Sequence, residues 1–175
     1  MNCPFECEFL QESRKHETPA PLTPIDLPNQ DIRVSEKFLE ENENLVFFVS
    51  HHLVHAALRV TGAVDSEVRQ ALDSLIRTWR TLQSGIYYET LPETRPALDL
   101  YRAMQGSLAE FQRHQSEIGY SKTGASTVLQ VLVFLQRLEL DRANGRPLGR
   151  AFLNVLWDYY GVPPQEPSPS ALILP

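Results

Sequence analysis

Two pairs of side chains in this sequence have the chemical types and the spacing of metal ligands. Cys3 and Cys7 are four residues apart near the start of the sequence, and His51 and His55 are four apart within the run HHLVH. On an α-helix, this spacing places both members of a pair on one face, a single turn apart. Two sulfurs and two imidazole nitrogens form the tetrahedral set that zinc prefers. The pattern predicts a structural zinc site that pins an N-terminal helix to the rest of the protein.

Two other interpretations of the same residues stay open. Iron in place of zinc would indicate a metal-dependent redox or sensor protein that uses the cysteine pair and the HHLVH cluster. Without a metal, Cys3 and Cys7 would be small apolar side chains packed beside Phe5 and Phe9. The histidines would then belong to a solvated polar face of their helix.

A further pattern lies in the turn RLELDRANGRPLGR. Arg146 and Arg150 flank the predicted start of a last helix, where backbone N–H groups can hold a phosphate or carboxylate. The alternative is an ordinary helix junction, in which Arg137 and Asp141 form an ion pair at helix spacing. The sequence therefore offers Arg146 and Arg150 as an anion-binding site in competition with simple local ion pairing.

Signals for catalysis are scarce in this sequence. It contains no glycine-rich phosphate loop, no GxSxG elbow and no HExxH zinc-protease motif. The repeated Glu-x-x-His motifs of carboxylate-bridged di-iron proteins are absent as well. We therefore expect a non-enzymatic interaction or regulatory protein, which binds a protein partner or associates with itself.

Charge limits the classes of partner. The sequence has 16 Lys and Arg against 22 Asp and Glu, a net charge of -6, and no long basic run. Nucleic acid and anionic membranes attract clustered positive charge, so neither is expected as a partner. The N-terminal residues MNCPFECEFLQ lack the basic start and apolar run of a secretory signal, which leads us to expect a cytoplasmic protein.

The elements that must position these residues are predicted to be helices. Residues 128–140, VLQVLVFLQRLEL, are apolar almost all round a helix, except for a polar stripe of Gln130, Arg137 and Asp141. This pattern predicts a buried central helix over 128–144. No stretch alternates as a half-buried strand does, so we expect an all-α bundle of about six helices, one domain over 1–161. The other five helices are predicted at 4–17, 31–61, 65–84, 96–118 and 147–160.

Helix starts are predicted from residues that can cap them. Asp31 or Ser35 would cap the helix over 31–61, Asp65 the next helix, and Ser126 the central one. Each has a short polar side chain that can accept a hydrogen bond from the first turn.

Three segments are predicted to lie outside the helices. Residues 18–30 contain four prolines, which predicts an extended strap across the bundle. Residues 162–175 form a second proline-rich stretch, which we expect to be a flexible tail. The connection IYYETLPETR is expected to pack Tyr87 and Tyr88 as a lid or short turn.

Overall fold

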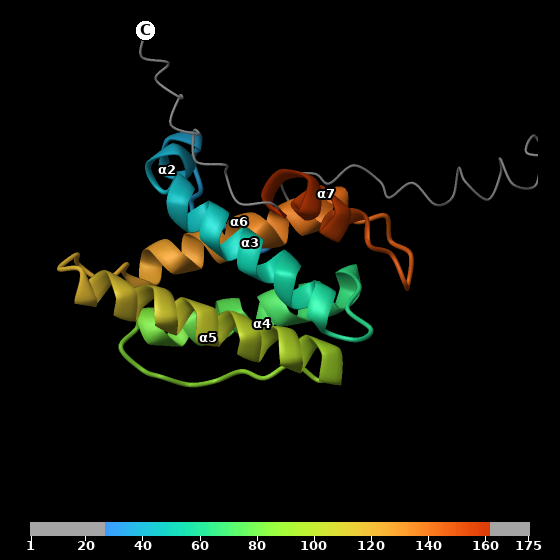
Figure 1. The fold of residues 1–175 in the computed structure, drawn as a ribbon, viewed down its shortest axis with the longest axis horizontal. Coiled ribbons are helices and arrows are strands. Elements are labelled where there is room, and N and C mark those ends of the chain that lie inside the picture. Colours follow the sequence, from blue (N-terminus) through green and yellow to red (C-terminus); the bar gives the residue numbers. More distant parts are fainter. Residues whose placement is uncertain (1–26, 162–175) are drawn as a thin grey trace, which may run out of the picture.

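A computed structural model of the protein describes residues 27–161, and these residues form helices and their connections, without a strand (Figure 1). This arrangement confirms the all-α prediction. The predicted N-terminal helix at 4–17, the strap over 18–26 and the tail over 162–175 lie outside the described residues. The helices, in chain order, are α2 (Glu36–Glu41), α3 (Glu43–Arg59), α4 (Asp65–Gln83), α5 (Arg95–Glu117), α6 (Ala125–Arg142) and α7 (Ala151–Tyr160).

Helix α6 lies at the centre of the hydrophobic core, as its apolar sequence predicts. It packs most extensively against α4 and also contacts α3 and α7, while α5 covers α3 and α4. No helix among the described residues combines the length and the apolarity needed to cross a lipid bilayer. The buried apolar side chains of α6 are Val128, Leu129, Val131, Leu132, Val133 and Leu135.

Two residues of the polar stripe of α6, Gln130 and Arg137, bind the chain segment that precedes α2, whereas Asp141 is exposed. The Arg137 guanidinium donates to the carbonyl oxygens of Asn29 (2.8 Å) and Ile32 (3.0 Å). The Gln130 side chain donates to the carbonyl oxygen of Arg33 at 2.8 Å. Backbone carbonyls outside regular structure need such donors. The described end of the predicted strap is therefore held against the central helix by side chains of the polar stripe.

The single helix predicted over 31–61 is instead two helices, α2 and α3, with a break at Asn42. The Asn42 side chain donates to the carbonyl oxygen of Phe38 at 2.9 Å, and this local bond competes with continuation of the helix. Ser35 accepts from the backbone N–H of Phe38 at 3.1 Å and is the cap of α2. Of the two predicted caps, Ser35 is thus confirmed and Asp31 is wrong.

Helix α7 is capped by a residue of α4. Asp65 was predicted to cap its own helix, but Val64 holds that position. The buried Asp65 carboxylate instead accepts from the backbone N–H groups of Phe152 (3.1 Å) and Leu153 (3.2 Å). Helix α7 also begins later than predicted, at Ala151. A carboxylate is well placed there, because the first N–H groups of a helix lack partners within it.

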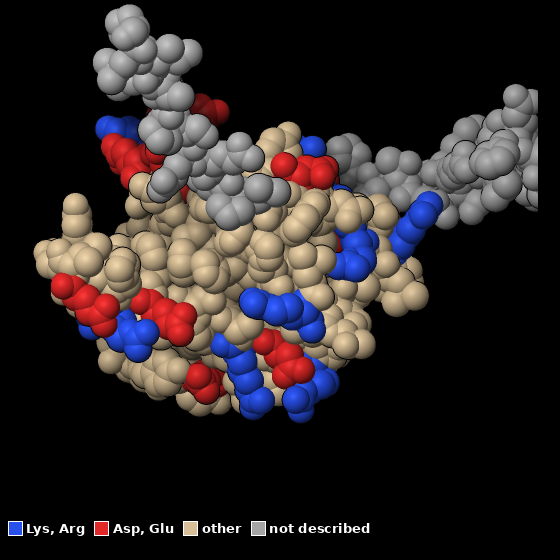
Figure 2. All heavy atoms as spheres, in the orientation of Figure 1, with Lys and Arg blue, Asp and Glu red and all other residues tan. Residues whose placement is uncertain are grey.

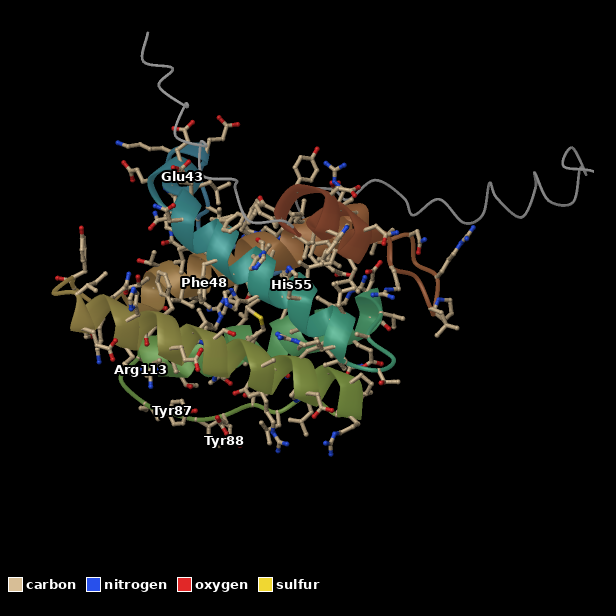
Figure 3. The ribbon with its side chains drawn as sticks, in the orientation of Figure 1. Glu43, Phe48, His55, Tyr87, Tyr88 and Arg113 are labelled. Atoms are coloured by element: carbon tan, nitrogen blue, oxygen red, sulfur yellow. The ribbon has the colours of Figure 1, made fainter. Side chains whose placement is uncertain are left out.

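Two smaller expectations are corrected. Ser126 does not cap α6, because that helix begins at Ala125 with Gly124 as its N-cap. The connection after α4 does not pack as a lid, since Tyr87 and Tyr88 are 63% and 65% exposed. Figure 3 places both tyrosines at the outer edge of the molecule, on the connection beside α4 and α5.

Candidate binding groove

The histidine pair of HHLVH lies against the end of α7. His51 Nδ1 is 2.8 Å from the carbonyl oxygen of Tyr160, and His55 Nε2 is 2.8 Å from that of Gly161. A carbonyl oxygen only accepts, so these two ring nitrogens carry protons and donate. The last carbonyls of a helix have no partner within it. His51 and His55 therefore bind the C-terminal end of α7, and the solvated face considered above is not what they form.

The same geometry leaves the second nitrogen of each ring, His51 Nε2 and His55 Nδ1, outside these two bonds. The ring centroids are 4.2 Å apart. Histidines that bind metal ordinarily donate their other N–H to a carbonyl or carboxylate, as these two rings do. Residues 27–161 contain no group of three or more side chains suited to hold a metal. Cys3 and Cys7 lie outside the described residues, so the zinc site stays a prediction.

Aromatic contacts connect the histidine pair to a groove beside it. The Phe47 ring stacks on His51 with centroids 5.5 Å apart. The same ring makes an edge-to-face contact with Tyr160, with ring centroids 6.1 Å apart. Phe47 thus has one neighbour in the histidine pair and one at the end of α7. Both Phe47 and Tyr160 also line the groove, so the histidine contacts fix part of its wall.

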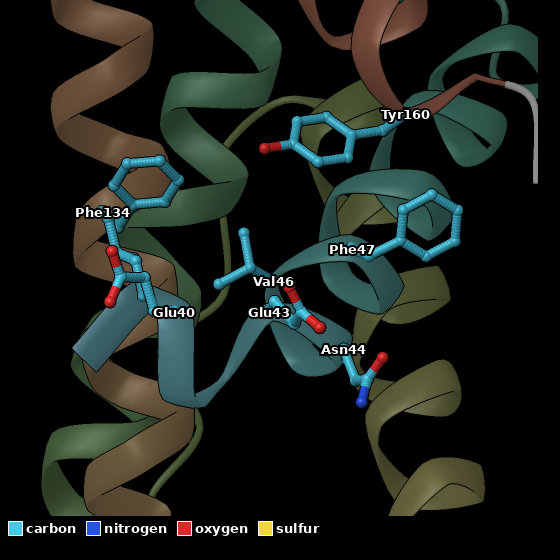
Figure 4. Close-up of a pocket in the computed structure, with 8 residues that line it drawn as sticks. Glu40, Glu43, Asn44, Val46, Phe47, Phe134 and Tyr160 are labelled. Atoms are coloured by element: carbon cyan, nitrogen blue, oxygen red, sulfur yellow. The ribbon is translucent and has the colours of Figure 1, made fainter. Parts of the chain in front are cut away.

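The groove lies where α2, α3, α6 and α7 meet, and its volume is about 520 Å³ (Figure 4). Phe134 projects from α6 and Tyr160 from α7, with Val46 of α3 between them in the view. This volume is within the range of pockets that bind ligands. The apolar wall consists of Leu39, Val46, Phe47, Phe134 and Tyr160.

The break at Asn42 helps to form this groove. It separates Leu39 and Glu40, at the end of α2, from Val46 and Phe47, in the first turns of α3. Side chains from both helices then line one hollow. A continuous helix would rotate residues seven apart by almost two full turns and place them on one straight face.

The rim of the groove is acidic. Glu40 and Glu43 line it and are exposed. Helix α2 also carries Glu41, whose carboxylate is 3.7 Å from the ammonium group of Lys37. Figure 2 shows acidic atoms gathered over α2, with few basic ones beside them. Burial raises the pKa of Tyr160, so its hydroxyl adds no charge to the wall near neutral pH.

The environment of Arg146 and Arg150 differs from the one predicted. Arg146 and Arg150 are exposed and precede α7, as expected. However, the backbone N–H groups of Phe152 and Leu153 donate to the Asp65 carboxylate, which is an internal anion. A phosphate or carboxylate ligand would have to bind beside it. The anion site at Arg146 and Arg150 stays a prediction.

The groove was not predicted from the sequence, because α6 and α7, which complete it, lie far along the sequence from α2 and α3. Phe134 lies within residues 128–140, which were predicted to form the buried central helix. The sequence features that could have indicated the groove are the acidic run at residues 40–44 and the nearby Phe47, just before HHLVH. Comparison with protein-family models, curated proteins and solved structures gives no match. Function is therefore inferred from the groove and its residues.

Proposed function

We propose that the protein is a non-enzymatic helical interaction or regulatory protein whose groove binds an apolar helix flanked by lysine and arginine. The observation that carries this proposal is an apolar wall, in which Phe47 and Phe134 are only partly buried, beneath a rim of Glu40 and Glu43. Covering apolar surface is favourable, and a hollow in such a surface fixes where a partner binds.

The shape of the groove favours a helical partner. Its wall is built by helices that pack at an angle to one another, and an amphipathic helix binds in such a hollow through side chains at i, i+3, i+4 and i+7. Phe134 on one side and Tyr160 on the other would contact the apolar face of that helix. Val46 forms the buried floor between them.

The charge of the rim selects the flanks of the partner. Glu40 and Glu43 would attract basic side chains on either side of the apolar face and repel acidic ones. The tail of the same chain, residues 162–175, has no lysine or arginine and contains Glu166. It therefore lacks the charge that the rim favours, and the proposed occupant is a separate basic partner.

A zinc site would support the proposed partner binding by holding two parts of the chain together. We propose that His51 and His55, together with Cys3 and Cys7, hold zinc and fix the N-terminal segment close to Phe47. The alternative proposal is a metal-dependent redox or sensor protein with iron at these four side chains. The carbonyl bonds that orient both imidazoles support either metal.

Peptide binding to the full chain tests the proposal. The probe is a fluorescently labelled amphipathic helix with leucine on one face and lysine on its flanks. A second peptide keeps the leucine face and has glutamate in place of lysine. We expect the lysine peptide to bind about tenfold tighter or more, because the acidic rim repels the glutamate-flanked peptide. Added salt should reduce this difference.

A variant in the wall separates groove binding from general electrostatic attraction. Phe134→Glu places a charge in the apolar wall and should abolish binding of the lysine peptide, whereas Phe111→Glu changes a half-buried side chain of α5 outside the groove. Equal binding of both peptides, or unchanged binding by Phe134→Glu, would overturn the proposal.

A further inference from the structure

The connection after α4 is held along one edge by hydrogen bonds at every second residue. The N–H of Ile86 donates to the carbonyl oxygen of Thr81 at 2.9 Å, and that of Tyr88 donates to the Thr81 hydroxyl at 3.3 Å. The N–H of Thr90 donates to the Thr78 hydroxyl at 3.0 Å. An extended chain turns alternate peptide groups to the same side. The segment thus runs like a strand beside α4 (Figure 1).

One of the two anchoring residues, Thr78, belongs to a largely buried hydrogen-bond network. The Thr78 hydroxyl is 3.1 Å from Tyr101 Oη, and both side chains are buried at 1% exposure. The Gln105 amide donates to Tyr101 Oη and accepts from Trp79 Nε1, both at 3.1 Å. Fully bonded buried networks are rigid. The inner edge of the connection is therefore fixed to the body of the protein.

The outer edge consists of the residues between the anchored ones, Tyr87 and Glu89. Within the described residues, their backbone N–H and C=O groups make no hydrogen bond. Their side chains share a face, because Tyr87 Oη donates to the Glu89 carboxylate at 2.6 Å. This bond raises the pKa of Tyr87 to about 12, so the hydroxyl keeps its proton near neutral pH. The outer edge thus offers two donors and two acceptors.

The side chains of this segment suit a paired strand. Ile86, Tyr87 and Tyr88 are 66%, 63% and 65% exposed, and aromatic and β-branched residues are favoured in strands. An exposed edge with unpaired backbone groups is a template for another strand. Residues 86–91 contain none of the lysine or proline that commonly blocks such pairing.

We infer that residues 86–90 form a dimer interface, in which two copies of the chain pair as antiparallel strands about Tyr88. The two outward residues are two positions apart, so a two-fold axis at Tyr88 places Tyr87 of each copy opposite Glu89 of the other. Residues opposite one another in this way exchange both N–H···O bonds. All four outward N–H groups of the pair then meet a C=O group. The edge is complementary to itself, which is what a two-fold interface requires.

The side chains agree with this register. Tyr88 would lie opposite Tyr88 of the second copy, as a non-hydrogen-bonded antiparallel pair. Side chains are closest in such pairs, and contacts between aromatic rings there stabilise the paired strands. Each Glu89 would face a tyrosine of the other copy, not the other Glu89, so like charges are not opposed. An unrelated peptide would match this pattern of donors, rings and charge only by coincidence.

This interface is separate from the groove, which α2, α3, α6 and α7 build. Pairing of five residues covers less than the roughly 1,200 Å² of a stable complex, so the dimer should be weak and depend on concentration. Failure of peptide binding in the groove would leave the dimer untouched, and the reverse also holds.

Sedimentation velocity of the full chain over a wide concentration range tests the inference. We expect a monomer at low concentration and a dimer at high concentration. Glu89→Pro removes one outward N–H and should abolish the dimer, whereas Glu89→Ala keeps the backbone and should retain it. Circular dichroism checks that both variants fold. A monomer at every concentration, or a dimer unaffected by Glu89→Pro, would overturn the inference.

Disulfide trapping tests the register itself. In a Cys3→Ser, Cys7→Ser background, Tyr88→Cys should cross-link rapidly under an added oxidant, because the two-fold axis places the new thiols within disulfide range. Glu89→Cys is the matched control and should cross-link at least several times more slowly. In this register, position 89 lies opposite position 87 of the second copy, so the two introduced thiols are diagonal neighbours and farther apart. Equal rates for the two variants would show that the register is wrong.

Discussion

His51 of α3 donates from Nδ1 to the carbonyl oxygen of Tyr160, 2.8 Å away at the end of α7. At the other end of α7, the Asp65 carboxylate accepts from the N–H groups of Phe152 and Leu153. Both ends of this helix are thus held by side chains of other helices. Because Tyr160 lines the groove, the position of the groove wall depends on these two contacts.

The cap of α7 by Asp65 should be a measurable part of the stability. Asp65→Ala leaves the N–H groups of Phe152 and Leu153 without an acceptor and should lower the free energy of unfolding by about 1 to 2 kcal/mol. Asp65→Asn should lose less, because its amide oxygen still accepts. Urea unfolding measures both, with the exposed neighbour Ser66→Ala as control. A loss by Asp65→Ala no larger than that of the control would contradict the cap.

The ion pair of Arg69 and Glu139 joins α4 to the central helix. Two hydrogen bonds of 2.8 and 2.9 Å connect them, and the Glu139 side chain is wholly buried while that of Arg69 is 43% exposed. Arg69→Met would leave a buried carboxylate without its partner. We expect a loss of about 2 to 3 kcal/mol, below the value for a fully buried pair because Arg69 is partly solvated.

The double variant Arg69→Met, Glu139→Leu is the matched comparison in urea unfolding. Replacing both partners with apolar side chains should recover most of the lost stability. If the double variant is less stable than Arg69→Met, the account of an uncompensated buried charge is wrong.

Two carboxyl groups should give pH dependences of opposite sign. Burial raises the pKa of Glu139 above its ordinary 4.5, and Arg69 only partly opposes this. The folded protein then holds this proton more tightly than the unfolded chain, so the stability that Glu139 contributes falls as the pH rises above 4.5. The hydrogen bond from Arg80 lowers the pKa of Asp31 from 3.8, so its contribution is present above 3.8 and is lost as the pH falls.

Chemical unfolding at a series of pH values checks these signs. The advantage of the native sequence over Glu139→Gln should decrease with rising pH, and its advantage over Asp31→Asn should increase. Parallel pH profiles for the native sequence and either variant would contradict the assigned shift.

The proposed metal site predicts a defined stoichiometry. Protein purified without added metal or chelator should contain about one zinc per chain by elemental analysis. The zinc should be lost in Cys3→Ser, Cys7→Ser and in His51→Gln, His55→Gln, and kept in His114→Gln, which alters an exposed histidine. Iron with a visible absorption band would favour the redox or sensor alternative. The absence of metal from the native chain would exclude both metal proposals for protein so prepared.

The sequence predicted the helices well, because their signals are local. The apolar run over 128–140 correctly identified the central helix, and Ser35 correctly marked the start of α2. The break at Asn42 was missed, since it depends on one side chain bonding to a carbonyl four residues earlier. Ordinary helix propensity gives little warning of such a competing bond.

The partners of polar side chains were harder to predict, because most come from distant segments. Arg137 was expected to pair with Asp141, but it donates to carbonyls before α2, and Asp141 pairs with Arg142 at 2.9 Å. From the sequence, HHLVH was identified as a cluster that contains candidate metal ligands. Its contacts with the last carbonyls of α7 require the packing of two helices that lie about 100 residues apart, which no local pattern encodes.

The most direct test of the proposed function is a charge reversal at the rim of the groove. Glu40→Lys, Glu43→Lys should reverse the peptide preference, so that the glutamate-flanked helix binds tighter than the lysine-flanked one. Glu110→Lys, Glu117→Lys makes the same change in net charge on exposed positions of α5 and should leave the preference unchanged. Fluorescence anisotropy measures all combinations. An equal effect of both double variants would show that the acidic rim does not select the partner.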